Sequence, residues 1–117
     1  MQENVLVRLR HMLDAAREAA GFLSGKTRSD LNTDRMLVLT LLKEIEIVGE
    51  AASRVSLEGR AECDCVPWRD IIDMRNHLMH VYFDIDLDTV WKTASEDLPL
   101  LAEALERFLA HGSEGSC

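Results

Sequence analysis

Apolar residues recur at three- and four-residue intervals along most of this chain, the spacing that places them on one face of an α-helix. Over residues 4–23, charged side chains occupy much of the remaining helix surface. This helix should end at Ser24-Gly25, because glycine readily adopts the left-handed backbone of a helix C-terminus. Its predicted buried stripe consists of Val5, Leu9, Met12, Ala16, Ala19 and Leu23.

A second helix is predicted from near Ser29 or Asp30, either of which can cap it, to about Ser56. Its main stripe is Leu37, Val38, Leu41, Ile45, Val48, Ala52 and Val55, and further apolar residues lie outside that stripe at Met36, Leu39, Ile47 and Ala51. A helix that is apolar beyond one stripe needs neighbours on more than one side. We expect it to be the central helix, with its extra face under another helix or in a dimer interface.

Residues 57–66 read as a connecting loop, and Pro67 suits the first turn of a third helix that ends near residues 80–83. A fourth helix should be capped by Asp86, and Pro99 inside it predicts a kink near Ser95. Short connections between four such helices predict an all-α, antiparallel bundle of four to five helices.

The length of 117 residues and the apolar content of 47% fit one domain, placed at residues 1–110, followed by a flexible tail over 111–117. No basic stretch followed by an apolar run opens the sequence, and no segment approaches the roughly 18 apolar residues of a membrane span. We therefore expect a cytoplasmic protein.

The formal net charge of -8 excludes a broad cationic surface of the kind that general nucleic-acid binders use. Chemistry on RNA needs only a local cationic site, so a nuclease is not excluded. Cys63, Cys65 and Cys117 form neither a disulfide framework nor a redox pair, and we expect reduced thiols with no metal and no cofactor.

The third helix carries a polar cluster. On an ideal helix Asn76 and His80 share a face one turn apart, with Arg75 at its flank, so that Asn76 can hydrogen-bond the His80 ring. His77 lies on the polar side too and competes with His80 for any catalytic role. The opposite face, which should enter the core, carries Ile71, Met74 and Leu78.

These groups suffice for metal-independent cleavage of RNA. Histidine can take the proton of a 2′-hydroxyl, which attacks the adjacent phosphate, while the guanidinium of arginine offsets the developing charge. On spacing alone, a surface histidine and arginine on an ordinary amphipathic helix would be the favoured interpretation. Tyr82 would fall on the apolar side if the helix continued.

The segment Arg75-Asn76-His77-Leu78-Met79-His80-Val81-Tyr82 resembles the signature of HEPN domains, in particular that of the HepT toxins. The run over 42–52, LKEIEIVGEAA, is similar to the central helix of that family, and 68–98 also follows its pattern. The likeness covers most of residues 30–110.

The resemblance implies that Arg75 and His80 are the catalytic pair of an endo- or exoribonuclease, supported by Asn76, with two sites facing each other in a homodimer. It also implies a type VII-like toxin-antitoxin module, with small structured RNAs such as tRNA as substrates. An MntA-like nucleotidyltransferase antitoxin would silence the toxin by attaching AMP to Tyr82. Val81 and His77 depart from the glycine and the basic residue that family members often carry there.

Two alternatives stay open. The acidic chain could be a non-catalytic dimeric subunit that binds an adjacent nucleotidyltransferase through the same segment. It could also be a purely structural helical module, for which the apolar faces of the helices are the whole explanation.

Overall fold

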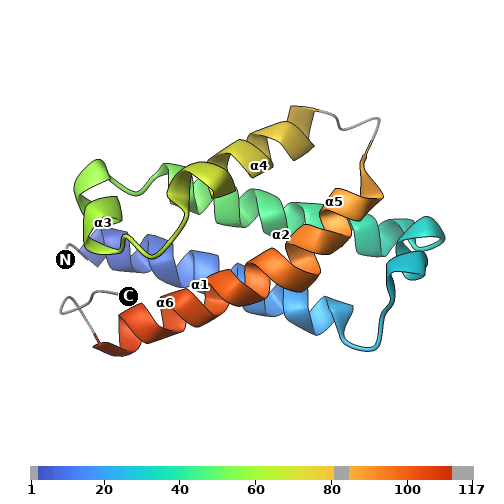
Figure 1. The fold of residues 1–117 in the computed structure, drawn as a ribbon, viewed down its shortest axis with the longest axis horizontal. Coiled ribbons are helices and arrows are strands. Elements are labelled where there is room, and N and C mark those ends of the chain that lie inside the picture. Colours follow the sequence, from blue (N-terminus) through green and yellow to red (C-terminus); the bar gives the residue numbers. More distant parts are fainter. Residues whose placement is uncertain (1–2, 81–84, 112–117) are drawn as a thin grey trace.

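A computed structural model describes residues 3–80 and 85–111, and these residues form the predicted all-α bundle (Figure 1). A 3-10 turn, η1 (Arg28–Asn32), separates the first two helices, and a π turn, η2 (Thr93–Asp97), joins the last two into one continuous helical segment. The α-helices are α1 (Glu3–Leu23), α2 (Arg35–Ser53), α3 (Leu57–Glu62), α4 (Trp68–His80), α5 (Leu87–Lys92) and α6 (Leu98–His111).

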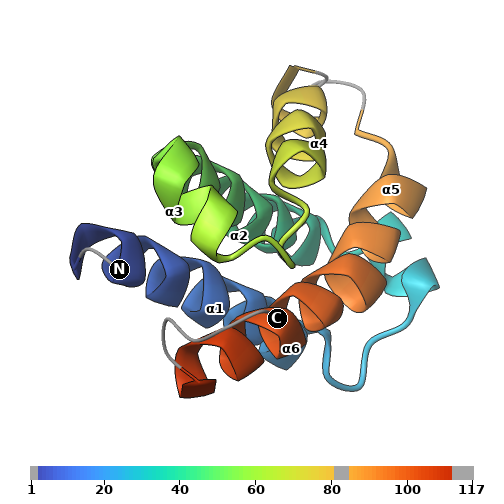
Figure 2. The ribbon, with the colours of Figure 1, turned by 60° about the vertical axis from the view of Figure 1, so that its left-hand side comes forward.

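The long helices run antiparallel in chain order, and α2 occupies the central position that the sequence predicts (Figure 1). It packs against α1 on one side and α4 on another, while α6 packs on α1. Figure 2 shows α4 standing on α2, away from α6. The additional apolar surface of α2 is thus partly covered within the chain, since Ala51 is buried, whereas Met36 and Leu39 are exposed.

The predicted apolar stripes form the core. Every residue of the main α2 stripe is buried, and so are five of the six in α1, with Leu23 partly buried. The stripe of the last helical segment is buried at Val90, Ala94, Leu98, Leu101, Leu105 and Phe108. The core face of α4 is buried at Ile71 and Leu78, and Met74 packs against it from the edge.

The predicted start of the second helix is wrong. Asp34 caps α2 by accepting a hydrogen bond from the Leu37 amide at 3.0 Å. Asp30 instead closes the preceding 3-10 turn, where its carboxylate accepts from the Thr27 amide at 2.7 Å. Both aspartates satisfy free amide groups at the start of a helical turn, so the sequence signal is the same for the short turn and the long helix.

The predicted loop over 57–66 contains the short helix α3, which the sequence reasoning missed. Ser56 caps it by accepting from the Gly59 amide at 3.0 Å. Gly59 is buried, and a β-carbon there would lie 3.0 Å from methyl groups of both Val5 and Val55. Six residues are too few for an apolar period to show, so the cap was the available signal.

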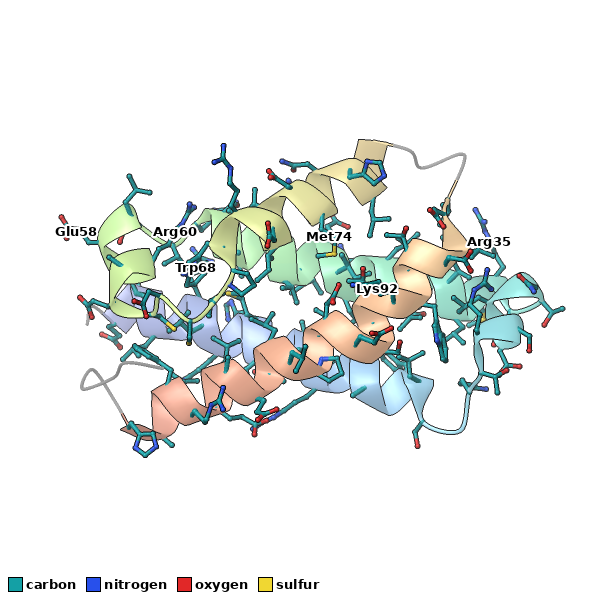
Figure 3. All side chains as sticks on the ribbon, viewed as in Figure 1. Arg35, Glu58, Arg60, Trp68, Met74 and Lys92 are labelled. Carbon is teal, nitrogen blue, oxygen red and sulfur yellow. The ribbon has the colours of Figure 1, made fainter. Side chains whose placement is uncertain are left out.

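The segment after α3 anchors the start of α4. The indole nitrogen of Trp68 (Figure 3) donates a hydrogen bond to the Cys63 carbonyl at 2.9 Å. Burial, with the charge of Asp64, raises the pKa of the Cys63 thiol to about 11. The expectation of reduced thiols is wrong for Cys65, which is disulfide-bonded.

The irregularity predicted near Ser95 takes the form of the π turn η2. The Leu98 amide donates to the carbonyl of Thr93, five residues earlier. Pro99 has no amide hydrogen to offer the Ser95 carbonyl, which is why the regular α-helical pattern is interrupted here. The Ser95 hydroxyl donates to the Trp91 carbonyl at 2.6 Å.

The last helix includes His111, which the predicted tail contained, and the flexible tail stays a prediction because residues 112–117 lie outside the described part of the chain. Within residues 3–80 and 85–111, no helix combines the length and apolar character that crossing a membrane requires.

Glu44 is the acidic residue that α2 buries, with 5% of its surface exposed. One of its carboxylate oxygens, Oε2, has no hydrogen-bond partner among the described residues. Burial, together with a hydrogen bond to Glu18 and the charge of that residue, raises the pKa of Glu44 to about 7. Glu44 is therefore a titrating group within the α1–α2 packing.

We expect the Glu44 titration to set the pH dependence of stability. The folded chain holds this proton more tightly than the unfolded chain, so the free energy of unfolding should fall as pH rises from about 4.5 to about 7. Glu44→Gln should flatten that fall and stabilise the protein at pH 8 by up to about 3 kcal/mol. Urea unfolding of the wild type and the variant across this pH range measures the free energy of unfolding. Exposed Glu96→Gln is the control, and an equal response of the two variants would refute the assignment.

Candidate active site

Arg75 lies midway along α4, and its guanidinium is held by two neighbours. Nη2 donates to Glu50 Oε2 at 2.9 Å, and Nη1 donates to Asn76 Oδ1 at 3.0 Å. The side chain is 27% exposed, and its Nε is buried with no partner among the described residues. The guanidinium is therefore fixed in direction yet partly open to solvent, and hydrogen-bonding capacity is left for a ligand.

Gly49 allows Arg75 to take this position. A methyl group on Gly49 would overlap Cβ and Cγ of Arg75. The stem of Arg75 therefore crosses α2 at a position where α2 has no side chain. The sequence reasoning included Gly49 only within a family-like run and did not foresee this contact.

Glu50 joins Arg75 to a second arginine. Its Oε1 accepts from Nε and Nη2 of Arg54, both at 2.9 Å, while Oε2 accepts from Arg75. The sequence reasoning also missed this role. An isolated glycine inside an otherwise regular helix was the available signal, because such a glycine often marks a close approach or a functional contact.

Asn76 is oriented by its neighbour. A guanidinium can only donate hydrogen bonds, so the atom facing Arg75 must be the amide oxygen, which leaves the Asn76 amide nitrogen as a donor. His80 is the last residue of α4, one turn further on the same helix face. The hydrogen bond from Asn76 to the His80 ring stays a prediction, because the His80 side chain lies outside the described part. Tyr82 lies outside the described residues too.

His77, the competitor for the catalytic role, is exposed on α4. The carboxylate of Asp86 caps α5 and accepts from the amide and hydroxyl of Thr89, which lowers the pKa of Asp86. The charge of His77 adds a smaller lowering effect.

The face of α4 that looks toward α6 borders a cavity of about 580 Å³. Met74 from α4 and Lys92 from α5 both line it (Figure 3). Its remaining wall is largely apolar and includes Leu98, Leu101 and Ala104. One side of α4 is therefore open to solvent rather than covered by α6.

The described residues thus form an α-helical bundle in which α4 carries an arginine that is ion-paired to the central helix α2, five residues before the end of α4 at His80. The family described as Ribonuclease HepT-like matches residues 12–108. The chain therefore belongs to the HepT-like ribonuclease family.

Named relatives agree with this family. "Probable ribonuclease HepT" of Thermococcus cleftensis is 32% identical over 68% of this chain and 72% of its own length. "Putative RNase MJ1380" of Methanocaldococcus jannaschii is 28% identical over 81% of this chain and 87% of its own. The same organism has "Gamma-glutamylcyclotransferase and putative RNase MJ0434", 29% identical over 93% of this chain, which spans only 49% of that relative. No solved structure matches the chain.

Gly49→Ala should destabilise the protein and displace Arg75, because the new methyl group overlaps the arginine stem. We expect a loss of about 1–3 kcal/mol, the usual cost of overpacking. Gly21→Ala is the matched control: Gly21 also lies in a helix, and no described atom is within 4 Å of a β-carbon there. That variant should be neutral or more stable by up to about 1 kcal/mol. Thermal unfolding followed by circular dichroism compares them, and similar shifts would contradict the close contact.

Proposed function

We propose that this protein is a metal-independent ribonuclease and the toxin of a type VII-like toxin-antitoxin module. The observation that carries the proposal is the fixed Arg75 guanidinium on the same helix that presents Asn76 and ends at His80. Membership of the HepT-like ribonuclease family supports it.

In the proposed reaction His80 takes the proton from a ribose 2′-hydroxyl. The 2′ oxygen then forms a bond to the adjacent phosphorus, and the bond from phosphorus to the 5′ oxygen breaks as that oxygen takes a proton from water. Arg75 donates hydrogen bonds to the phosphate oxygens as charge builds on them. Asn76, through its amide nitrogen, holds the His80 ring in orientation.

The proposal includes partners and regulation. The protein would act as a homodimer on RNA, with tRNA as a candidate substrate, and an MntA-like nucleotidyltransferase would be its antitoxin. Transfer of AMP to Tyr82, two residues beyond His80, would place a bulky anion beside the catalytic pair. Such an anion would compete with the RNA phosphate for Arg75.

The net charge of -8 favours a second candidate, a non-catalytic subunit that binds the nucleotidyltransferase. An acidic surface repels RNA, whereas it does not oppose contact with a protein partner. Stable complex formation by a protein that cleaves no RNA would support this candidate over the ribonuclease.

His80→Ala should lower RNA cleavage by a hundredfold or more, the order of magnitude that a general base contributes. The wild type and variant, purified without partner, would be incubated with total RNA and then tRNA in chelator, while growth inhibition is followed in cells. His77→Ala, on the same helix, is the matched control and should retain cleavage and toxicity. Undiminished cleavage by His80→Ala, or loss of cleavage in His77→Ala alone, would overturn the assignment.

Glu50 is proposed as a positioning residue that acts through Arg75. Glu50→Gln keeps the shape but removes the charge that holds the guanidinium, so kcat should fall roughly tenfold or more from misplacement of Arg75. The melting temperature should change little, because partly exposed ion pairs contribute at most about 1 kcal/mol. Glu103→Gln, which removes an exposed carboxylate paired with Arg107 on α6, is the control. A loss of stability without loss of kcat would show a structural role only.

A further inference from the structure

A groove of about 180 Å³ runs between α1 and α2 beside Arg75. Arg8 and His11 border it from α1, and Lys43 and Arg54 border it from α2 together with the carboxylates of Glu46 and Glu50. The backbone traces of the two helices lie side by side in both views (Figures 1 and 2). Ile47 and Ala51 add an apolar patch to the lining. A cationic rim beside an apolar patch suits a nucleotide, which presents a phosphate together with a ribose and a base.

Three of the four basic side chains of the groove are available to a ligand, whereas Arg54 is held by Glu50. Neither Arg8 nor His11 has a hydrogen-bond or ion-pair partner for its side chain among the described residues. Lys43 is paired with Glu46 only at 3.7 Å, and its side chain is 66% exposed. Exposed pairs of this kind are worth about 0–1 kcal/mol, so Lys43 can exchange its carboxylate for a phosphate at small cost.

The groove is continuous with the candidate active site. Glu50 lines the groove and binds Arg54 with one oxygen and Arg75 with the other. The guanidinium groups of Arg54 and Arg75 are thus separated by the width of one carboxylate. A strand whose scissile phosphate rests on Arg75 would have a neighbouring phosphate within reach of the groove.

We propose that this groove, defined by Arg8, His11, Lys43 and Arg54, binds the phosphodiester backbone of single-stranded RNA next to the bond that is cleaved. The inference rests on the ribonuclease proposed above. The groove would provide a local group of basic side chains on a chain of net charge -8, so that RNA phosphates are attracted to the place where the substrate must lie. Arg8 and Lys43 would each contact a phosphate, and the apolar patch would lie under a ribose or base.

The test uses the His80→Ala protein, which should bind RNA without cutting it, and a fluorescein-labelled oligouridylate as the probe. Fluorescence anisotropy at several salt concentrations gives Kd and its salt dependence. Adding Arg8→Ala and Lys43→Ala together should raise Kd about tenfold or more. Losing two phosphate contacts should also make the plot of log affinity against log salt shallower by about 1.4, at roughly 0.7 per phosphate on a single strand.

The matched control adds Arg10→Ala and Lys26→Ala, which remove the same charge from exposed positions outside the groove lining. This control should change Kd by less than about twofold. If both pairs of substitutions weaken RNA binding equally, general charge attraction explains the binding and the groove proposal is overturned. The proposal is also overturned if the groove pair leaves Kd unchanged or if the His80→Ala protein binds no RNA. Circular dichroism melting verifies that all variants are folded.

Wild-type cleavage measured in parallel separates the two proposals. RNA that binds through the groove yet stays intact with wild-type protein would reject the ribonuclease and retain the groove. RNA that is cleaved by wild type, with the groove pair binding as tightly as the control pair, would reject the groove and retain the ribonuclease.

Discussion

The contact between Gly49 and Arg75 is the constraint on which the candidate site depends. Without a side chain at position 49, α4 lies close against α2, and the arginine stem crosses the central helix instead of extending into solvent. Glu50, the next residue, then meets the guanidinium at 2.9 Å. Two adjacent residues of α2 thereby fix both the position and the direction of one cation. Because α2 is packed against α1 and α4, this geometry is tied to the core of the bundle.

Much of the fold could be predicted from the sequence because burial of a helix face leaves a repeating pattern. The apolar stripes between Val5 and Phe108 and the cap at Asp86 obey local rules. The start of α2 could not be read correctly, because Asp30 and Asp34 are equally good cap candidates in the sequence, whereas in the structure Asp30 lies inside the turn η1 and Asp34 caps α2. The helix α3 is shorter than two full periods, so its six residues carry too little pattern.

The site was predictable only in part, for a physical reason. Asn76 and His80 share a helix face, which spacing alone determines. The partner of Arg75 is on another helix, and no periodic relation connects Glu50 and Arg75 across their sequence separation of 25. Glycine at 49 was visible in the sequence, but what it makes room for depends on where α4 crosses α2. Long-range pairs of this kind depend on how the helices pack, and the sequence of a single segment does not determine that packing.

The π turn η2 has a consequence for the length of the last helical segment. The buried residues Val90, Ala94 and Leu98 of this segment follow one another at intervals of four residues. On a regular α-helix their direction would therefore rotate, from Val90 to Leu98, by nearly the angle that separates two successive residues. The π turn takes up that extra residue, which lets α5 and α6 keep their apolar faces aligned on both sides of Pro99. The π turn is equivalent to the insertion of one residue into an α-helix. Relatives that are one residue shorter here should carry a plain α-helix, and an alignment gap at 93–97 would mark a real difference in helix geometry.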